Sequence, residues 1–304
     1  MVEEMVLQEI EGKGDIALWR QENIAVFEHT KQLCGKHAKL KEAIQKSNAE
    51  QKFYPERKTA VEKELAENVL PAKRYEKPAQ VIVSKKRTLE AAADYADRQV
   101  CVLNFASASN PGGGVTKGSS AQEEAICRCS TLYESLTEKT MWDKFYAPHR
   151  KERNPLHNDD CIYTPEVVVF KTDTAYPRLL PEEKWYTVNV LTCAAPNLRA
   201  RPSNGMNSGD GDKLVRISQA ELKRLHEKRM RKVLDIAAAE GNEVVILGAF
   251  GCGAFCNPPG VVAAAMKTVV EEYRHQFQTI EFAVYCSPRD DENYQVFQRA
   301  LGRM

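Results

Sequence analysis

Residues 104–136 of this chain read NFASASNPGGGVTKGSSAQEEAICRCSTLYESL. The stretch begins at the end of an apolar run, residues 99–105, whose β-branched content predicts a buried strand. An Asn-Pro pair then breaks any regular element, and the three glycines at 112–114 let another group approach the backbone closely. Two serines, Ser119 and Ser120, are good N-cap residues, so a helix is expected to begin directly after them. The sequence therefore predicts a strand, a glycine loop and a helix in succession.

The first turn of that helix carries two neighbouring carboxylates, Glu123 and Glu124. Adjacent helical residues point about 100° apart, so both cannot face one packed surface, but both can border a cleft at the helix start. Taken singly, the glycines are most often a turn, and the glutamates a solvated helix start that complements the helix dipole. Their coincidence favours acid/base chemistry at the edge of a cleft.

A second glycine-rich loop follows the strongest strand pattern in the chain, EVVIL at residues 243–247. It reads GAFGCGAF at 248–255 and leads to a helix expected near Pro259. A strand, a glycine loop and a helix start together offer backbone N–H donors to an anion. The loop is neither a P-loop, because no Gly-Lys-Ser/Thr closes it, nor the GxGxxG of a dinucleotide-binding unit. It predicts a phosphate site.

The spacing of the first stretch, GGG followed by seven residues and then QEE, resembles the signature of the poly(ADP-ribose) glycohydrolases. The surrounding residues, including Ser107 where the animal enzymes carry Asn, resemble the microbial branch of that family. In the family a second glycine-rich loop holds the diphosphate of ADP-ribose, and residues 248–255 are similar to it. The resemblance is specific at these two segments and weak over the rest of the chain.

The expected fold is an α/β class, three-layer α/β/α macrodomain-like sandwich with a mixed, mainly parallel sheet and an N-terminal helical extension. Alternating strand and helix patterns point to the same class, because helices then cover both faces of the sheet. The expected boundaries are residues 1–75 for the helical extension packed on the core and residues 76–304 for the catalytic macrodomain.

The resemblance implies hydrolysis of the ribose–ribose O-glycosidic bonds of poly(ADP-ribose). It implies that Glu124 is the general acid and then the general base, while Glu123 holds ribose hydroxyls. The substrate-binding residues implied are Gln122, Ser107, Gly112, Gly113, Gly114, Val115, Gly251, Cys252, Gly253, Ala254 and Phe255. The expected partners are poly(ADP-ribose) or ADP-ribosylated proteins as substrate and ADP-ribose as product, with no cofactor, no metal, no direct DNA binding and no membrane.

Composition agrees with an ordinary globular protein of one large domain or two small ones. Among 304 residues, 43 are Lys or Arg and 42 are Asp or Glu, so a net charge of +1 gives no overall field to attract DNA or a membrane. The nine scattered cysteines indicate reduced thiols, and neither of the two close pairs, Cys127/Cys129 and Cys252/Cys256, is followed by a matching Cys or His pair at zinc-ligand spacing. No apolar stretch is long enough to span a membrane, and we expect an intracellular, cytoplasmic protein, or a nuclear one if the source is eukaryotic.

Periodicity predicts the remaining elements. The expected strands are 80–84, 167–171, 186–193, 243–247 and 280–285, and the expected helices are 17–51, 88–95, 217–239, 261–275 and 291–301; residues 58–67 are expected to form a short helix or strand pair. A loop at 149–160, which contains His157, Asp159 and Asp160, is expected to be a solvated turn, and one at 196–212 to be exposed, mobile and a candidate lid. The basic residues of the helix at 217–239 are expected to form a solvated face.

Two alternatives stay open. An ADP-ribose-binding macrodomain would share the fold and the diphosphate loop but would not need the Gln-Glu-Glu triplet at 122–124. A hydrolase of another ADP-ribosyl linkage would keep that triplet, and the contacts to its leaving group would lie outside both motifs.

Overall fold

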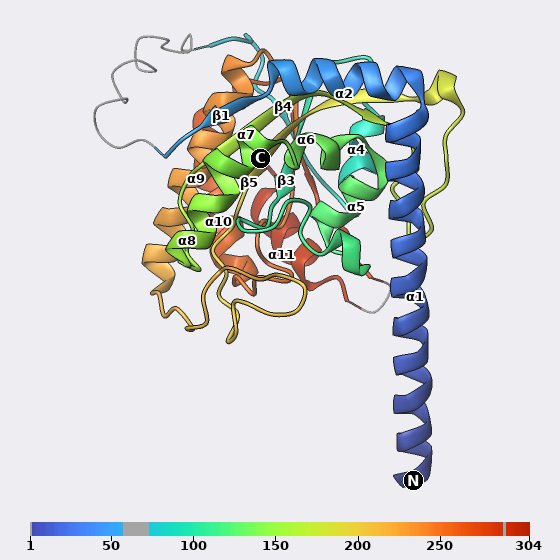
Figure 1. The fold of residues 1–304 in the computed structure, drawn as a ribbon. Helices are drawn as coiled ribbons and strands as arrows, with labels where there is room; N and C mark the ends of the chain where they lie inside the picture. Colours follow the sequence, from blue (N-terminus) through green and yellow to red (C-terminus); the bar gives the residue numbers. More distant parts are fainter. Residues whose placement is uncertain (1, 57–72, 288–289) are drawn as a thin grey trace.

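The fold is built on a seven-stranded sheet with the order β1-β4-β5-β3-β6-β7-β2 in the computed structural model, which describes residues 2–56, 73–287 and 290–304 (Figure 1). The strands are β1 (Lys52–Tyr54), β2 (Gln80–Ser84), β3 (Val100–Phe105), β4 (Cys161–Val169), β5 (Tyr186–Cys193), β6 (Val244–Leu247) and β7 (Thr279–Ala283). The β1–β4 and β4–β5 pairs are antiparallel, and the other four pairs are parallel. The expected mixed, mainly parallel sheet is confirmed.

Helices cover both faces of this sheet. They are α1 (Val2–Lys36), α2 (Ala38–Glu50), α4 (Thr88–Ala93), α5 (Gln122–Cys129), α6 (Leu132–Leu136), α7 (Lys139–Met141), α8 (Ala147–Glu152), α9 (Gln219–Ala239), α10 (Pro259–Tyr273) and α11 (Glu292–Leu301). One core cluster joins the sheet to α9, α10 and α11, and a second joins it to α1 and α4–α7. The molecule is therefore a three-layer α/β/α sandwich.

The side chains of the central strand β3 alternate between the two faces of the sheet, and this explains why there are two core clusters. Cys101 and Leu103 belong to the cluster on the α9–α11 side, whereas Val100 and Val102 belong to the cluster on the α5 side. Successive strand residues point to opposite faces, so a strand covered on both sides must be apolar at every position. This is why the apolar run at 99–105 shows no polar alternation.

Most of the expected elements are confirmed with ends shifted by a few residues. The helix expected at 17–51 is instead two helices, α1 and α2, and the strand expected at 167–171 begins at Cys161. The structure adds the edge strand β1 at Phe53 and the short helices α6–α8, which were not predicted; α8 extends into the loop expected at 149–160. The N-cap of α5 is Ala121 and not Ser119 or Ser120, and Ala121 makes no side-chain capping bond. The prediction for 58–67 falls outside the described residues.

The N-terminal helix α1 runs along α5 and extends beyond the rest of the fold (Figure 1). Its Asn23 Nδ2 donates to the Gly118 carbonyl at 3.2 Å, and its Thr30 Oγ1 donates to the Arg128 carbonyl at 2.5 Å. A Cβ on Gly118 would lie 2.3 Å from the Arg20 carbonyl oxygen, so glycine permits this close approach. In the described part of the chain, no helix has the length and apolarity that crossing a bilayer demands.

The loop at 149–160 is not a solvated turn, because His157, Asp159 and Asp160 are all buried. Asp159 forms ion pairs with Arg229 (2.9 Å) and Lys228 (2.7 Å), both from α9. The expectation of a solvated basic face on α9 is therefore wrong at Arg229, which is fully buried. A carboxylate and a guanidinium can both be buried when they pair with each other. Because these two residues are far apart in the chain, their pairing cannot be predicted from the sequence.

The loop at 196–212 is also less exposed than expected. Asn207 and Asp210 are buried, and Ser109 Oγ donates to Asp210 at 2.7 Å. Asn197 Nδ2 donates to the same carboxylate at 2.9 Å, and the His157 ring lies 3.3 Å from it. These partners hold the pKa of Asp210 at about 2 despite its burial, with the His157 contact the largest of the lowering effects. The buried carboxylate of Asp210 therefore joins this loop to Ser109, which lies just before the first glycine loop.

Candidate active site

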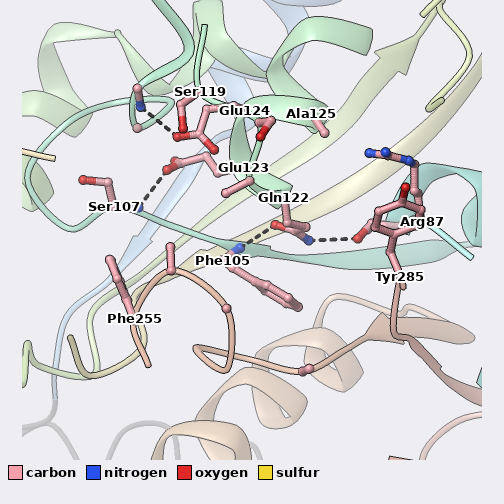
Figure 2. A pocket seen from close by; sticks show the side chains of 18 of the residues that line it. Arg87, Phe105, Ser107, Ser119, Gln122, Glu123, Glu124, Ala125, Phe255 and Tyr285 are labelled. Carbon is pink, nitrogen blue, oxygen red and sulfur yellow. Dashed lines mark hydrogen bonds between the residues drawn. The ribbon is translucent and has the colours of Figure 1, made fainter. Parts of the chain in front are cut away.

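Gln122 fixes the start of α5 against the end of β3. The Phe105 amide donates to Gln122 Oε1 at 2.8 Å (Figure 2). Gln122 Nε2 also donates to the Leu103 carbonyl at 2.7 Å. The amide side chain thus mimics one more rung of a strand ladder, which orients the helix that follows. The two glutamates after Gln122 are held next to the carboxyl end of β3.

Glu123 is almost completely buried at 3% exposure. Its Oε2 accepts from the Ser107 amide at 2.7 Å, and its Oε1 accepts from Asn104 Nδ2 at 3.3 Å. Burial, and then the neighbouring Glu124, raise the pKa of Glu123 well above its usual value. Glu123 therefore retains its proton to a higher pH than an isolated glutamate does.

This raised pKa predicts a pH-dependent stability difference for Glu123→Gln. A folded-state pKa above the unfolded one favours folding below the unfolded pKa, and that contribution is lost as pH rises through the folded pKa. Glutamine stays neutral and avoids the loss, so the variant should gain thermal stability relative to wild type between pH 5 and pH 8. Melting curves of both proteins at the two pH values check this. A difference in melting temperature between variant and wild type that shrinks with rising pH would contradict it.

Glu124 differs from Glu123 in having an oxygen available. Its Oε1 accepts from the Gly114 amide at 2.8 Å, whereas its Oε2 is buried and has no hydrogen-bond partner among the described residues. The side chain is 6% exposed and borders a cavity (Figure 2). A buried carboxyl oxygen without a partner is costly, which is typical of a site that a ligand completes.

The glycine loop is shaped around these carboxylates. Gly113 has φ +59°, and a Cβ there would lie 2.5 Å from Glu124 Oε1 and 3.0 Å from Glu123 Oε2. Gly112 has φ +67°, and its Cβ would lie 2.8 Å from the Tyr133 ring. Only glycine combines this backbone conformation with such close contacts. Gly112 and Gly113 are therefore required by the close packing of this loop against the Tyr133 ring and the two carboxylates.

The second glycine loop faces the first across the cavity. Gly251 has φ +81°, and Asn257 Nδ2 donates to its carbonyl at 3.0 Å and to the Pro196 carbonyl at 2.7 Å. A Cβ on Gly253, in contrast, would have no atom within 4 Å, because this residue opens onto the cavity. Phe255 lies at the end of the loop and forms part of the wall (Figure 2).

A single cavity of about 560 Å³ brings the two loops together. This is within the usual range for sites that bind small ligands. The residues named from the sequence that line it are Ser107, Gly113, Gly114, Gln122, Glu123, Glu124, Gly251, Gly253, Ala254 and Phe255. Gly112, Val115 and Cys252 do not line it, since Val115 is fully buried in the α5-side core and Cys252 packs against the other core.

Several other residues that line the cavity were not expected from the sequence. Arg87 and Tyr285 form one end of the cavity (Figure 2), with the guanidinium 3.9 Å from the ring centroid. Asn207 comes from the loop at 196–212, and its Oδ1 accepts from Ser107 Oγ at 2.6 Å. Trp19 and Arg128 complete the wall on the α1 side. Arg87, Tyr285 and Asn207 belong to separate segments that share no local motif, so no signal in the sequence marks them. Arg128 and Trp19 lie in segments that resemble the microbial branch, but neither was expected at the site.

Clusters of three or more His, Cys, Asp or Glu side chains suited to a metal ion are not found in the described ranges. The nine cysteines are all unpaired.

Comparisons with known proteins agree with this geometry. A family model described as the catalytic domain of microbial-type PARG matches residues 21–172. The solved structure of poly(ADP-ribose) glycohydrolase (PARG) from Thermomonospora curvata is 31% identical, with 92% of this chain and 99% of that chain covered and a TM-score of 0.77. The same enzyme bound to the inhibitor ADP-HPD is 29% identical over the same shares, with a TM-score of 0.74.

A third structure, the Deinococcus radiodurans enzyme in complex with ADP-ribose, is 29% identical, with 84% and 96% of the two chains covered and a TM-score of 0.69. No match was found among curated protein sequences. The family model and the structural neighbours point the same way as the paired glutamates and the two glycine loops. The chain belongs to the family of microbial-type poly(ADP-ribose) glycohydrolases.

Proposed function

We propose that this protein hydrolyses the ribose–ribose O-glycosidic bonds of poly(ADP-ribose) and releases ADP-ribose, with Glu124 as the general acid and base. The assignment of Glu124 is carried by two observations: the residue lines the cavity, and its Oε2 is buried without a hydrogen-bond partner among the described residues. A module that only reads ADP-ribose does not need an ionisable group at this position, whereas hydrolysis needs a proton donor and acceptor beside the scissile bond. Family membership supports the reaction.

The reaction needs a proton on the departing ribose oxygen and an activated water at the anomeric carbon. In the proposed sequence, Glu124 gives its proton to the departing 2′-oxygen as the C1–O bond breaks. The resulting carboxylate then takes a proton from the water that attacks the oxocarbenium-like carbon, which restores the starting state. Glu123 holds ribose hydroxyls, and its buried contacts with Ser107 and Asn104 keep it in place.

ADP-ribose is proposed to lie with its diphosphate across residues 251–255 and its distal ribose toward residues 112–115. Support comes from the position of the second loop, which follows β6 and precedes the start of α10, where backbone N–H groups favour an anion. The available space at Gly253 and the wall formed by Phe255 fit the same placement.

We also propose that residues 76–304 form the catalytic macrodomain and that residues 1–75 serve as an extension packed on it. The contacts of α1 with α5, and of α2 and β1 with β4, support this division. An intracellular location is proposed on the basis of the nine unpaired cysteines, most of which are buried thiols. Substrates are proposed to be the free polymer or ADP-ribosylated proteins, without direct DNA or membrane binding.

Gly253→Val tests the proposed diphosphate loop. Because a Cβ at this position meets no protein atom, the variant should fold normally, while its side chain occupies the space proposed for the ligand. Titration calorimetry should show that ADP-ribose affinity is lost, by about 100-fold or more, which corresponds to about 2.7 kcal/mol.

The matched control is Gly260→Val, at the start of α10, where a Cβ also meets no atom within 4 Å but the residue does not line the cavity. Its affinity should equal that of wild type. Unchanged affinity in Gly253→Val would show that the diphosphate lies elsewhere.

The reaction itself is tested by incubating wild-type protein with purified poly(ADP-ribose) and measuring released ADP-ribose by chromatography. Monomeric ADP-ribose that accumulates with time is the expected result. Binding of the polymer without release would make the protein a reader.

A further inference from the structure

We propose that the α1-side arm of the cavity is a subsite for the leaving side of the polymer, where Arg128 binds a phosphate and Trp19 packs against the base of the unit next to the scissile bond. This inference rests on the proposed hydrolysis of poly(ADP-ribose). The arm is lined by Trp19 and Asn23 of α1, Ser119 and Ser120 before α5, and Arg128 within α5. The ADP-ribose placement proposed above uses none of these residues.

Arg128 is a buried cation with too few partners. The residue is 4% exposed, its Nη1 donates to the Ser119 carbonyl, and its Nε is buried without a hydrogen-bond partner. None of the ion pairs in the described part of the chain includes it. Burial lowers the pKa of its guanidinium, which expresses the cost of a desolvated positive charge. An anion that enters the cavity would offset this cost and satisfy the free donors.

The carboxylates close to Arg128 do not act as the anionic partner of its guanidinium. Asp173 also lines the cavity, but its nearest cation is Arg87, at 4.0 Å between Nη1 and Oδ1, and its Oδ2 accepts from the Leu89 amide at 3.0 Å. Glu124 is directed to the Gly114 amide. Arg128 lines the cavity, and no carboxylate of the described chain lies within ion-pair distance of its guanidinium.

Position places this cation next to the reacting atoms. Glu124 and Arg128 are four residues apart on α5, so they lie on the same helix face with Cβ atoms about 6 Å apart. Helical side chains lean toward the N-terminus, and Arg128 reaches back to the carbonyl of Ser119, ahead of the helix. Its guanidinium therefore lies beside Ser119, in the segment that joins the first glycine loop to α5.

The chemistry of the polymer matches such an arm. The departing oxygen is the 2′-oxygen of an adenosine ribose, and that ribose carries an adenine on one side and a 5′-phosphate on the other. When the terminal ADP-ribose unit lies against the two glycine loops, the adenosine of the preceding unit, which carries the departing oxygen, must extend from Glu124 into another part of the cavity. Trp19 is half-buried and offers an aromatic face to a base, while Arg128 offers donors to a phosphate.

The test compares two substrates, poly(ADP-ribose) and an ADP-ribose glycoside whose leaving group is 4-nitrophenol, which has neither phosphate nor adenine. For Arg128→Gln, the ratio of kcat/KM for the polymer to kcat/KM for the glycoside should fall about 10- to 100-fold, the usual effect of losing a charged hydrogen bond. For Trp19→Ala the ratio should fall about 5- to 50-fold, the usual effect of losing a stacked base. Affinity for ADP-ribose itself should change less than about threefold in both variants.

Arg20→Gln is the matched control, because Arg20 is exposed on α1 beside Trp19 and does not line the cavity. Its ratio should equal that of wild type. An equal loss on both substrates in Arg128→Gln and Trp19→Ala would overturn the inference, and so would no loss on either. If Arg128→Gln does not fold, Trp19→Ala alone decides. Failure of the proposed function looks different, since wild type would then cleave neither substrate.

Free phosphate is distinguished from the polymer by titrating inorganic pyrophosphate into protein saturated with ADP-ribose. Binding to wild type that is lost in Arg128→Gln supports the anion subsite. Pyrophosphate binding together with an unchanged substrate ratio would overturn the assignment of the subsite to the polymer.

Discussion

Glu124→Gln should reduce release of ADP-ribose from poly(ADP-ribose) by at least about 100-fold, while affinity for ADP-ribose stays within a few-fold of wild type. Glutamine keeps the shape of the side chain and an oxygen that can accept from the Gly114 amide. It can neither protonate the departing oxygen nor accept a proton from water. A positioned acid/base group is typically worth about 10²- to 10⁴-fold in rate.

The measurements are the initial rate of ADP-ribose release and the affinity for ADP-ribose by calorimetry. Glu123→Gln is the informative neighbour, because it should impair release partly through weaker ribose binding and so raise KM as well as lower kcat. Equal activity in wild type and Glu124→Gln would remove Glu124 from the mechanism. The carboxylate of Asp159 is then a poor replacement, since it is paired with Arg229 and does not line the cavity.

Gly113→Ala should lower kcat/KM by about 100-fold through displacement of the carboxylates, without any change in a titratable group. A methyl group at this position would lie 2.5 Å from Glu124 Oε1, so the carboxylate or the loop must shift. Displacements of about 1 Å at a reacting group are known to cost that much in rate. The positive φ adds about 1–2 kcal/mol of backbone strain for alanine.

Gly241→Ala is the control that separates the effect of backbone strain from the effect of displacing the carboxylates. Gly241 has φ +79°, and a Cβ there would meet nothing within 4 Å, so this variant carries a comparable backbone cost without touching the site. Both variants should be less stable than wild type in thermal melts, Gly113→Ala by the larger amount because of its close contacts, but only Gly113→Ala should lose activity in the release assay. Activity in Gly113→Ala equal to that in Gly241→Ala would show that the loop tolerates the methyl group and does not position Glu124.

Much of the fold and the reacting centre could be predicted because their information is local. The apolar run at 99–105 is buried on both faces, and the glycine triplet and the Gln-Glu-Glu triplet follow it within one supersecondary unit. A strand, a turn without Cβ atoms and a helix start need only neighbouring residues to define them. The second loop after β6 was predictable for the same reason.

Boundaries and exposure were less predictable where a distant partner decides them. Sequence favoured Ser119 or Ser120 as the cap of α5, but Gln122 holds the helix start against β3 instead. The short edge strand β1 exists because β4 offers it a free edge, not because of a strong strand pattern of its own. Burial of Asp159 likewise depends on Arg229, seventy residues later in the chain.

The sequence by itself determined the central strand, the two glycine loops and the carboxylate pair, since each is a contiguous pattern set by backbone geometry and helix periodicity. Only the tertiary structure decided which other side chains surround them. Arg87, Tyr285, Asn207, Trp19 and Arg128 come from five separate segments and meet at one cavity because the strand order places the ends of β2, β3, β6 and β7 at the same edge of the sheet. The burial of Arg128 without a counter-ion is a property of that assembly, because desolvation depends on everything packed around the guanidinium and on nothing in its neighbouring sequence.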